Sequence, residues 1–488
     1  MIELITFISN SKYYILVALI TIAIHKVYGF LKWRKSADSI PGPPASLITG
    51  NILDIGRAGG LAPYLKYLHK TYGPIVKYWA TPNELHVTIN EPNILDQFDI
   101  QTTERPINFV EFLRGFFGDK GLIYLDAEQA KARRLIWHKT FAKRPYEKIM
   151  PRFIEIINKR GTDWLSERNG GKAVKVNIQA EARSLWNKLN EYNVFGDAST
   201  SDNLSEKFEE TIELLLQIRF RFAPVLPYTV IWRKRKELLD YVRQEVQRLI
   251  NEQLDRRGES LANGNDFLSH LLNDEELTEE AFFDEVLTLL FVVTDNFMGI
   301  ANLFHQLAEN KNVQERVRKE VQDVWGDKLP TTTDELSSMT YTRAVVKEVL
   351  RFCGTSNITL RELQHDYFIQ NKYHIPKDAL VVVPISVIHR NPNYWTEPDK
   401  FNPDRFLEGS KDSQDRSRMA YVPFGFGARS CLGQRYAMNT LTLLAGLLVK
   451  RFDIEPITRY DDVAWKEAIF STHASDGIWL NFIPRTVE

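Results

Sequence analysis

One short stretch of the sequence could hold a metal ion through sulfur. It runs from Phe424 to Gly433 as Phe-Gly-Phe-Gly-Ala-Arg-Ser-Cys-Leu-Gly and stands just before a long apolar run. Its glycines allow close approach of a flat partner, and Cys431 lies near the open end of the following predicted helix, where unpaired N–H groups favour a thiolate. A lone cysteine beside a glycine-rich turn is as often a small buried side chain without chemistry. The residue types alone leave both interpretations open.

The spacing within this stretch carries more information. The pattern Phe-x-x-Gly-x-Arg-x-Cys-x-Gly resembles the haem-binding loop of the cytochrome P-450 superfamily, the haem-thiolate monooxygenases, and every specified position is filled. Together with the N-terminal anchor predicted below, it is similar to the microsomal, membrane-anchored type. The resemblance implies that Cys431 is the metal ligand, the proximal thiolate on the iron of haem b (iron protoporphyrin IX). It also implies that Arg429 faces a haem propionate, that Phe424 packs near the sulfur, and that the backbone at Gly427 approaches the haem.

A second arginine matches the family in the helix predicted over residues 126–141. Arg134 corresponds to the family's propionate-binding arginine, whose fork can bind both oxygens of a carboxylate. The tryptophan usually found four residues earlier is Ala130 here, and Trp137, on the same helical face by spacing, is considered as a substitute donor to the haem. Without the resemblance, Arg133 and Arg134 would be interpreted as a solvated helix face.

An ionic network is expected on the thiolate side of the haem. Glu348 and Arg351 stand three residues apart on one predicted helical face and could pair, although such pairs usually lie at the surface and contribute little. Their spacing is similar to the family's Glu-x-x-Arg, which is joined by the arginine matched by Arg405 and locks the fold there. Arg361 and Asp366 match the family's Arg-x-x-x-x-Asp, which makes Arg361 a second propionate partner.

The opposite, distal side departs from the family. A long helix predicted over residues 280–309 is apolar over much of its length, as expected for a helix through the middle of a large domain, and is similar to the family's central helix. The family usually has Ala-Gly-x-Asp/Glu-Thr there, whereas residues 292–296 read Val-Val-Thr-Asp-Asn. The resemblance implies that Asp295 and Asn296 deliver protons with the help of water, or that ordinary oxygen activation has been lost, since an amide is not an acid.

The N-terminus predicts a membrane anchor. Residues 13–24 form an apolar run, continued by Val27, Phe30 and Leu31, and a basic flank follows at residues 32–35. This run is close to the roughly 20 residues that cross a bilayer, and the basic flank predicts a cytosolic C-terminal side. A cleaved signal peptide is disfavoured because the sequence has no cleavage site of small residues. A mitochondrial presequence is disfavoured because no arginine occurs before Arg34. A buried amphipathic helix is the remaining alternative.

A second stretch suits a membrane surface. Residues 222–232 are largely apolar and precede a cluster of four basic residues at 233–236. An apolar loop with cations beside it can dip into a bilayer and place its charges at the headgroups. The alternative is a buried loop followed by a solvated helix start. In the family this region forms the lid over the substrate channel.

Composition limits the remaining possibilities. The chain has 488 residues, a formal net charge of −1 and scattered basic residues, so nothing indicates nucleic-acid binding. Two cysteines exclude a disulfide framework and fit a reducing compartment. No linker, low-complexity tract or repeat divides the chain after residue 45, so we predict an anchor with its basic flank over residues 1–39 and one haem-binding catalytic domain over 40–488. Short strands are predicted near 75–78 and 84–89, and a hairpin over 470–482 with its turn at 475–477.

The resemblance therefore implies a mainly α fold with small β-sheets and haem between a long central helix and the Cys431 loop. The leading hypothesis is a monooxygenase of the endoplasmic reticulum membrane, single-pass with a cytosolic catalytic domain, that oxidises a lipophilic small molecule such as a sterol or fatty acid. Electrons would come from NADPH through a membrane-bound reductase, with a cytochrome b-type donor as a further partner. Two alternatives stay open: a reductase-independent haem-thiolate isomerase or dehydratase acting on a peroxide, and a haem- or lipid-binding protein without turnover.

Overall fold

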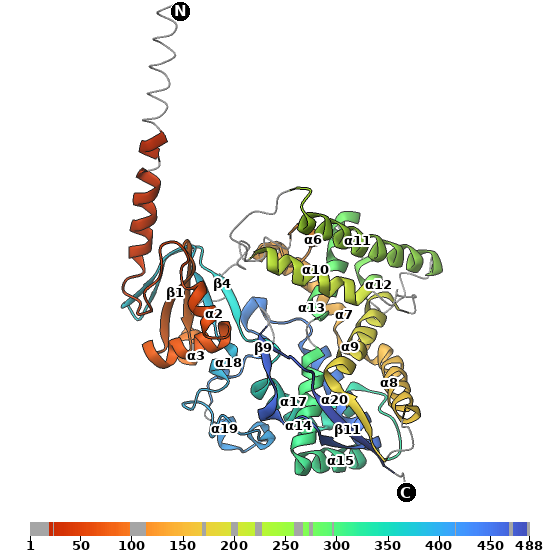
Figure 1. Ribbon diagram of the computed structural model, residues 1–488. Helices are drawn as coiled ribbons and strands as arrows, with labels where there is room; N and C mark the ends of the chain where they lie inside the picture. The colour runs from red at the N-terminus through yellow and green to blue at the C-terminus, as the bar shows by residue number, and fades with distance from the viewer. Residues whose placement is uncertain are drawn as a thin grey trace, which may run out of the picture. The chain divides into compact units, whose positions relative to one another are not determined.

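The computed structural model is mainly helical with small sheets (Figure 1), which confirms the predicted fold class. It describes residues 19–22, 24–97, 114–167, 172–196, 204–219, 227–257, 267–272, 277–294, 297–414, 416–467 and 472–485. The chain divides into two compact units. The first covers Met1–Phe98 and Leu360–Pro384, and the second covers Asp99–Thr359 and Ile385–Glu488.

The first unit is built on a four-stranded sheet. Its strand order is β1 (Ile75–Thr81), β2 (Glu84–Ile89), β7 (Leu380–Val383) and β4 (Thr359–Glu362). The predicted strands near 75–78 and 84–89 are β1 and β2, which pair antiparallel, whereas β2 pairs parallel with β7. Every residue of β7 is buried, as expected for a strand in the middle of a sheet. The other elements of this unit are helices α2 (Ile52–Arg57), α3 (Leu61–Tyr72) and α4 (Pro92–Gln97) and the paired strands β5 (Tyr367–Ile369) and β6 (Tyr373–Ile375).

The N-terminal part of this unit begins with helical residues 19–22 and 24–36. Apolar side chains on this helix are exposed: Leu19, Ile20, Ile22, Ile24, Val27, Tyr28 and Leu31. Within the described residues, the search for a helix of sufficient length and hydropathy to span a membrane finds none. Residues 13–18 of the predicted anchor lie outside that part of the chain. The segment after the helix lies against β1, because the N–H of Lys77 donates to the carbonyl of Pro41 at 2.8 Å.

The second unit contains most of the helices. They are α6 (Arg114–Phe117), α7 (Ala127–Thr140), α8 (Lys143–Ser166), α9 (Ile178–Phe195), α10 (Leu204–Arg219), α11 (Val230–Arg257), α12 (Phe267–Leu272), α13 (Glu279–Thr294), α14 (Met298–Glu309), α15 (Lys311–Trp325), α16 (Thr333–Ser338), α17 (Thr340–Phe352), α18 (Ile385–Ile388), α19 (Lys411–Gln414) and α20 (Gln434–Arg451). The helix predicted over residues 280–309 corresponds to α13 and α14, and residues 295–296 between them lie outside the described residues.

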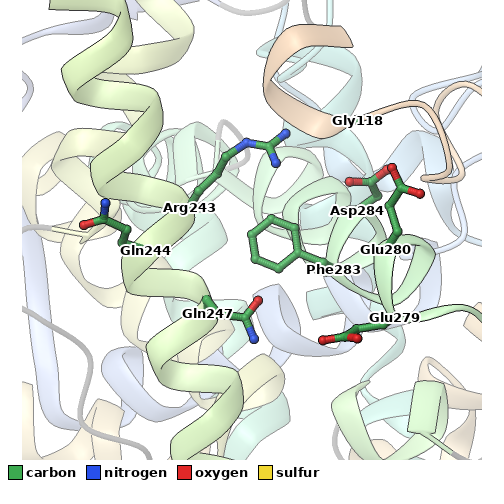
Figure 2. A pocket seen from close by; sticks show the side chains of 8 residues that line it. All are labelled: Gly118, Arg243, Gln244, Gln247, Glu279, Glu280, Phe283 and Asp284. Carbon is green, nitrogen blue, oxygen red and sulfur yellow. The ribbon is translucent and has the colours of Figure 1, made fainter.

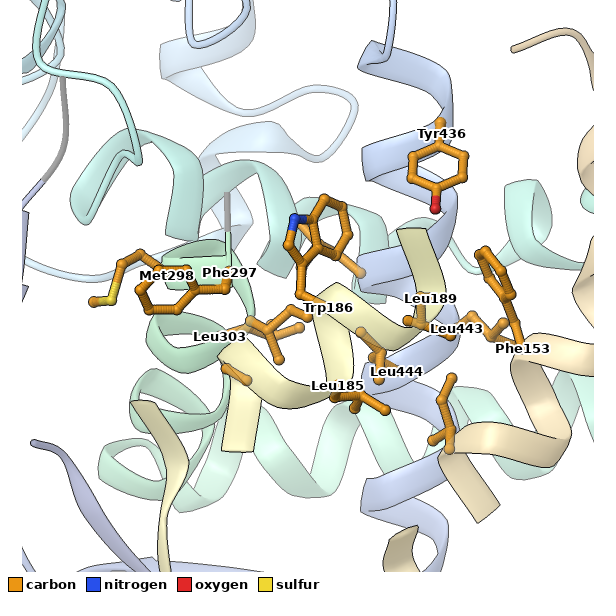
Figure 3. Packing of buried hydrophobic residues seen from close by; sticks show 14 of the residues in the cluster. Phe153, Leu185, Trp186, Leu189, Phe297, Met298, Leu303, Tyr436, Leu443 and Leu444 are labelled. Atoms are coloured by element: carbon orange, nitrogen blue, oxygen red, sulfur yellow. The ribbon is translucent and has the colours of Figure 1, made fainter. Parts of the chain in front are cut away.

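The core of this unit lies between α9, α14 and α20. Figure 3 shows side chains of these helices packed together, among them Trp186, Leu303 and Leu443. All three are buried. Burying an apolar side chain of this size contributes about 1.5–3 kcal/mol, so this cluster fixes the position of α20, the helix that directly follows the Cys431 loop.

The C-terminal strands correct one prediction. The hairpin expected over residues 470–482 has its turn, but its two strands do not pair with each other. Strand β10 (Thr472–Ala474) pairs with β9 (Trp465–Glu467), whereas β11 (Trp479–Pro484) lies between β3 (Val174–Asn177) and β8 (Phe452–Pro456). Alternation of apolar and polar residues marks strands but does not choose their partners, and here β11 fills both of its edges with distant segments.

Candidate functional site

The loop that carries Cys431 is closed by its own backbone. The N–H of Cys431 donates to the carbonyl of Phe424 at 2.8 Å, and a 3₁₀ turn over Gly427–Arg429 lies between them. Gly425 and Gly427 have φ of +68° and +65°, a region that side chains other than glycine rarely adopt. Helix α20 begins three residues after Cys431, at Gln434. The exposed thiol forms no disulfide, and Phe424, half-buried, packs against the core.

One arginine contacts the Cys431 loop, and another belongs to it. Arg134 in α7 donates through Nη2 to the carbonyl of Ser430 at 2.7 Å, next to Cys431. Arg429 is buried and donates through Nη2 to the carbonyl of Leu125 at 3.0 Å, just before α7. Burial lowers the pKa of Arg134, the charge of Arg429 lowers it further, and the charge of Cys431 opposes both effects.

This donor set fits haem. Two half-buried or buried cations close together repel each other, and carboxylates placed between them relieve that repulsion. An exposed thiol in a glycine-containing loop can reach an iron atom, and guanidinium forks suit propionate oxygens. The residues that would hold the group in this unit are therefore Cys431, Arg134 and Arg429, with Phe424 beside the sulfur and Gly427 in the loop backbone.

The remaining predicted propionate partner belongs to the first unit. Arg361 lies in β4, is buried, and donates through Nη1 to the carbonyl of Leu360 at 2.7 Å. The carboxylate of Asp366 accepts from the N–H of Lys377 at 2.8 Å and contacts the ring of His374 at 3.0 Å. Because Cys431 lies in the other unit, the role of Arg361 toward the haem stays a prediction.

The buried carboxylate of Glu348 in α17 is surrounded by donors. It accepts from Nε and Nη2 of Arg351 at 2.7 and 2.8 Å, from Nε of Arg405 at 3.1 Å and from the N–H of Asn402 at 2.7 Å. Asp412, which the sequence patterns did not single out, accepts from Nη1 of Arg405 at 2.6 Å. The two cations are thus balanced by two carboxylates, an arrangement that can be buried without a net charge.

The predicted distal pair, Asp295 and Asn296, lies outside the described residues. The preceding residues of α13 do show an unpredicted acid. Glu285 is fully buried, and its carboxylate accepts from the indole Nε1 of Trp137 at 2.9 Å and from Nη1 of Arg133 at 3.2 Å. Trp137, which the sequence suggested as a substitute donor to the haem, therefore donates its indole N–H to Glu285 in this structure. The sequence signal for Glu285 is an acid directly before the apolar run 286–293.

A separate cavity of about 550 Å³ lies between α11 and α13. Figure 2 shows Arg243, Gln244 and Gln247 on one side and Glu279, Glu280, Phe283 and Asp284 on the other, with Gly118 above. Asp284, directly before Glu285, lines this cavity and accepts from the N–H of Lys120 at 3.0 Å. None of the residues predicted to bind haem lines it.

Comparison with known proteins adds to this geometry. The model of the family described as Cytochrome P450 matches residues 40–477. Cytochrome P450 3A18 of Rattus norvegicus is 25% identical over 449 residues, which cover 86% of each chain. Cytochrome P450 4F5 of Rattus norvegicus is 27% identical over 411 residues, 78% of this chain and 76% of that protein. The structure of retinoic acid-bound cyanobacterial CYP120A1 superposes with a TM-score of 0.78 at 23% identity, covering 91% of this chain and 99% of that chain.

Proposed function

This chain belongs to the cytochrome P450 family, a family of haem-containing oxidoreductase monooxygenases, and on that premise we propose that it oxidises a lipophilic small molecule such as a sterol or fatty acid. The observation that carries the proposal is the exposed Cys431 thiol beside Arg134 and Arg429 in the closed loop. When bound there, haem supplies the chemistry that activates molecular oxygen, and a thiolate ligand favours that chemistry.

The chain's own residues would divide the remaining work. Cys431 holds the iron, Phe424 keeps water from the sulfur, and the backbone at Gly427 lets the loop approach the haem. Arg134, Arg429 and Arg361 hold the propionates and fix the orientation of the group. On the opposite side, Asp295 would pass protons through a water molecule that Asn296 orders by hydrogen bonds. Glu348, Arg351 and Arg405 keep the thiolate side in place.

Electrons would come from NADPH through a membrane-bound reductase, with a cytochrome b-type protein as a second donor. We place the protein at the endoplasmic reticulum membrane, held by an N-terminal anchor within residues 1–39 and with its catalytic domain, residues 40–488, in the cytosol. Exposed apolar residues between 19 and 31 support this placement. So does the start of α11, where Tyr228 and Val230 are exposed and four basic residues follow at 233–236.

The experiment that tests this function supplies the haem-loaded full chain with reductase, NADPH and a panel of sterols, fatty acids and retinoids. We expect a lipid-dependent rise in NADPH consumption and a product that carries one oxygen atom from labelled O₂. A panel in which every lipid shifts the haem spectrum but none is oxidised would contradict the monooxygenase and favour the binding protein without turnover.

A second function is favoured by the residues at positions 293 and 296. Val293 stands where the family usually has a small residue, and Asn296 stands where it has a hydroxyl that can pass protons. An isomerase or dehydratase that receives a peroxide as substrate needs neither a reductase nor that proton path. Rearrangement of a lipid hydroperoxide without reductase or NADPH would identify this activity.

A further inference from the structure

The two arginines beside Cys431 depend on a segment that is itself held by α13. Arg134 lies in α7, and Arg429 bonds the carbonyl of Leu125, immediately before α7. The position of both guanidinium groups therefore follows the position of residues 121–140. A buried carboxylate outside the Cys431 loop helps to fix this segment against the rest of the unit.

That carboxylate is Glu285. Arg133 and Trp137 stand four residues apart on one face of α7, and both donate to it, at 3.2 and 2.9 Å. The backbone N–H of Leu122 also hydrogen-bonds the carboxylate. One side chain of α13 thus holds both α7 and the segment that directly precedes it.

The backbone confirms how tightly this segment lies on α13. A Cβ added at Gly121 would stand 2.4 Å from Oγ1 of Thr288 and 2.9 Å from the carbonyl oxygen of Asp284, both in α13. Only glycine permits that approach, since contacts below about 3 Å require something to move. Glu285 therefore bonds a segment that has no slack toward α13.

The face of α7 that meets Glu285 differs from the face that meets the loop. Arg134 is the neighbour of Arg133 in the sequence, so it projects roughly 100° further round the helix, and its Nη2 reaches the carbonyl of Ser430. A rotation or shift of α7 after loss of the Glu285 contacts would move Arg134 directly. The Leu125 carbonyl, and with it Arg429, would move as well.

We propose that Glu285 is a positioning residue of the haem site, which holds Arg134 and Arg429 in place through Trp137, Arg133 and Leu122. This inference rests on the proposed contact of Arg134 with the haem. It predicts that Glu285 controls how firmly haem is retained although its carboxylate lies away from the Cys431 loop. The relevant measurement is the rate at which haem leaves the full-length protein for an excess of apomyoglobin.

Glu285→Ala is expected to raise this rate about tenfold, the lower end of the effect seen when an outer-shell partner of a metal ligand is removed. Trp137→Phe, which deletes the indole N–H but keeps an aromatic side chain, should raise it less. The matched control is Asp284→Asn, since Asp284 neighbours Glu285 on α13 but lines the cavity and contacts Lys120. The control should keep the wild-type rate.

A double-mutant cycle with Arg134→Gln separates positioning from a general loss of stability. If Glu285 acts through Arg134, then Glu285→Ala has little further effect in the Arg134→Gln background, because groups in one network are not additive. The inference would be overturned if the double variant lost haem at a rate raised by the product of the two single effects. A wild-type rate of haem loss in Glu285→Ala would overturn it as well. An Asp284→Asn variant as fast as Trp137→Phe would overturn it too.

Two outcomes distinguish this inference from the proposed function. If Arg134→Gln alone leaves the rate unchanged, the proposed haem contact of Arg134 is wrong and the inference is overturned together with it. If Arg134→Gln accelerates haem loss and Glu285→Ala does not, only the inference fails. Should Glu285→Ala not fold, the same cycle is run with Trp137→Phe, whose acceleration must vanish in the Arg134→Gln background.

Discussion

At the scale of single residues, the charges near Cys431 show why this loop suits an anionic group. Arg134 and Arg429 bond two different backbone carbonyls, of Ser430 and Leu125, through Nη2 in each case. The charge of Arg429 lowers the pKa of Arg134, which means that the pair is under mutual repulsion. Propionates between them would turn this repulsion into attraction on both sides.

The two cysteines are expected to behave differently. Cys431 is exposed, whereas Cys353 is buried and burial raises its pKa to about 12, so Cys353 stays a neutral thiol. We expect Cys431→Ser to abolish the reduced carbon monoxide difference band that is typical of a thiolate ligand. Cys353→Ala serves as the matched control and should keep the band. A thiolate band that survives in Cys431→Ser would show that the ligand has been assigned to the wrong residue.

Glu285 predicts a dependence of stability on pH. Burial raises the pKa of Glu285 from 4.5 to about 8, against the opposing effects of Arg133 and Trp137. Between these two pH values the folded protein keeps a proton that the unfolded chain has lost. Binding of this proton therefore stabilises the folded state, and this contribution is complete below pH 4.5 and is lost as the pH rises through 8.

The measurement is the free energy of unfolding in urea between pH 5 and 8.5. The wild-type protein should lose stability over this range more steeply than Glu285→Gln, in which the titrating group is gone. Asp284→Asn, one residue away, controls for the loss of a carboxylate in the same helix. Equal slopes for wild type and Glu285→Gln would contradict the assignment.

Local spacing accounts for what could be predicted at this scale. The Phe424–Gly433 loop is recognisable because its chemistry lies within ten residues of sequence. Glu285 was missed because its partner Trp137 stands 148 residues away, and no local pattern joins the two. The indole of Trp137 was considered as a haem donor on helical spacing alone, which identifies the face of a helix but not the element that this face meets.

At the scale of elements, the Glu348 network joins α17 to the 3₁₀ turn over Pro403–Phe406. Glu348 and Arg405 pair across these two elements, and Arg351 adds bonds to the carbonyls of His389 and Pro398. Each of these groups is buried and bonded, so removal of one member leaves the others without compensation.

We expect Glu348→Ala to yield little haem-loaded protein, because an uncompensated buried charge pair destabilises by about 3–5 kcal/mol. The matched control is Glu155→Ala in α8. Glu155 pairs with Arg152 at the same three-residue spacing, but at the surface, where such a pair contributes under about 1 kcal/mol. The measurement is the ratio of haem to protein after purification. Equal ratios in the two variants would contradict a structural role for Glu348.

Periodicity predicted several elements well. The strands near residues 75 and 84 and the helix after Cys431 are present because a repeat of two or of 3.6 residues directly encodes a buried face. The C-terminal hairpin was wrong for the opposite reason. The pairing of β11 with β3 and β8 depends on segments far away, such as Asn177 opposite Trp479, and a repeat carries no information on them.

At the scale of the whole molecule, the described residues expose apolar side chains at several places, and two of these have basic residues beside them. One is the helix of residues 19–22 and 24–36, and the other is the start of α11 around Tyr228 and Val230. Exposed apolar patches on a protein mark contact with a partner or a membrane. Anionic headgroups would then meet the exposed basic residues at these places, which are Lys32, Lys35, Arg233, Lys234 and Lys236.

The two places predict separable contributions to membrane binding. We expect the wild-type protein to resist extraction from microsomal membranes by alkaline carbonate. Replacing Leu19, Ile20 and Ile22 by serine in the full chain should allow this extraction. Replacing the four basic residues at 233–236 by neutral residues should instead make the remaining membrane binding insensitive to salt. Leu329→Ser, at another exposed apolar residue, is the control. A serine variant that still resists carbonate would contradict an anchor at this segment.

The parallel pairing of β2 with β7 sets His86 opposite Leu380. The ribosome therefore synthesises β2 long before its partner strand. At about 5–20 residues per second, the partner of β2 follows it by roughly 15–60 s. Throughout that delay the β1–β2 hairpin presents an open edge, with N–H and C=O groups that other chains can bind. Synthesis of this protein therefore passes through a stage at which its first sheet cannot be completed, and chaperones that shield strand edges would be needed most at that stage.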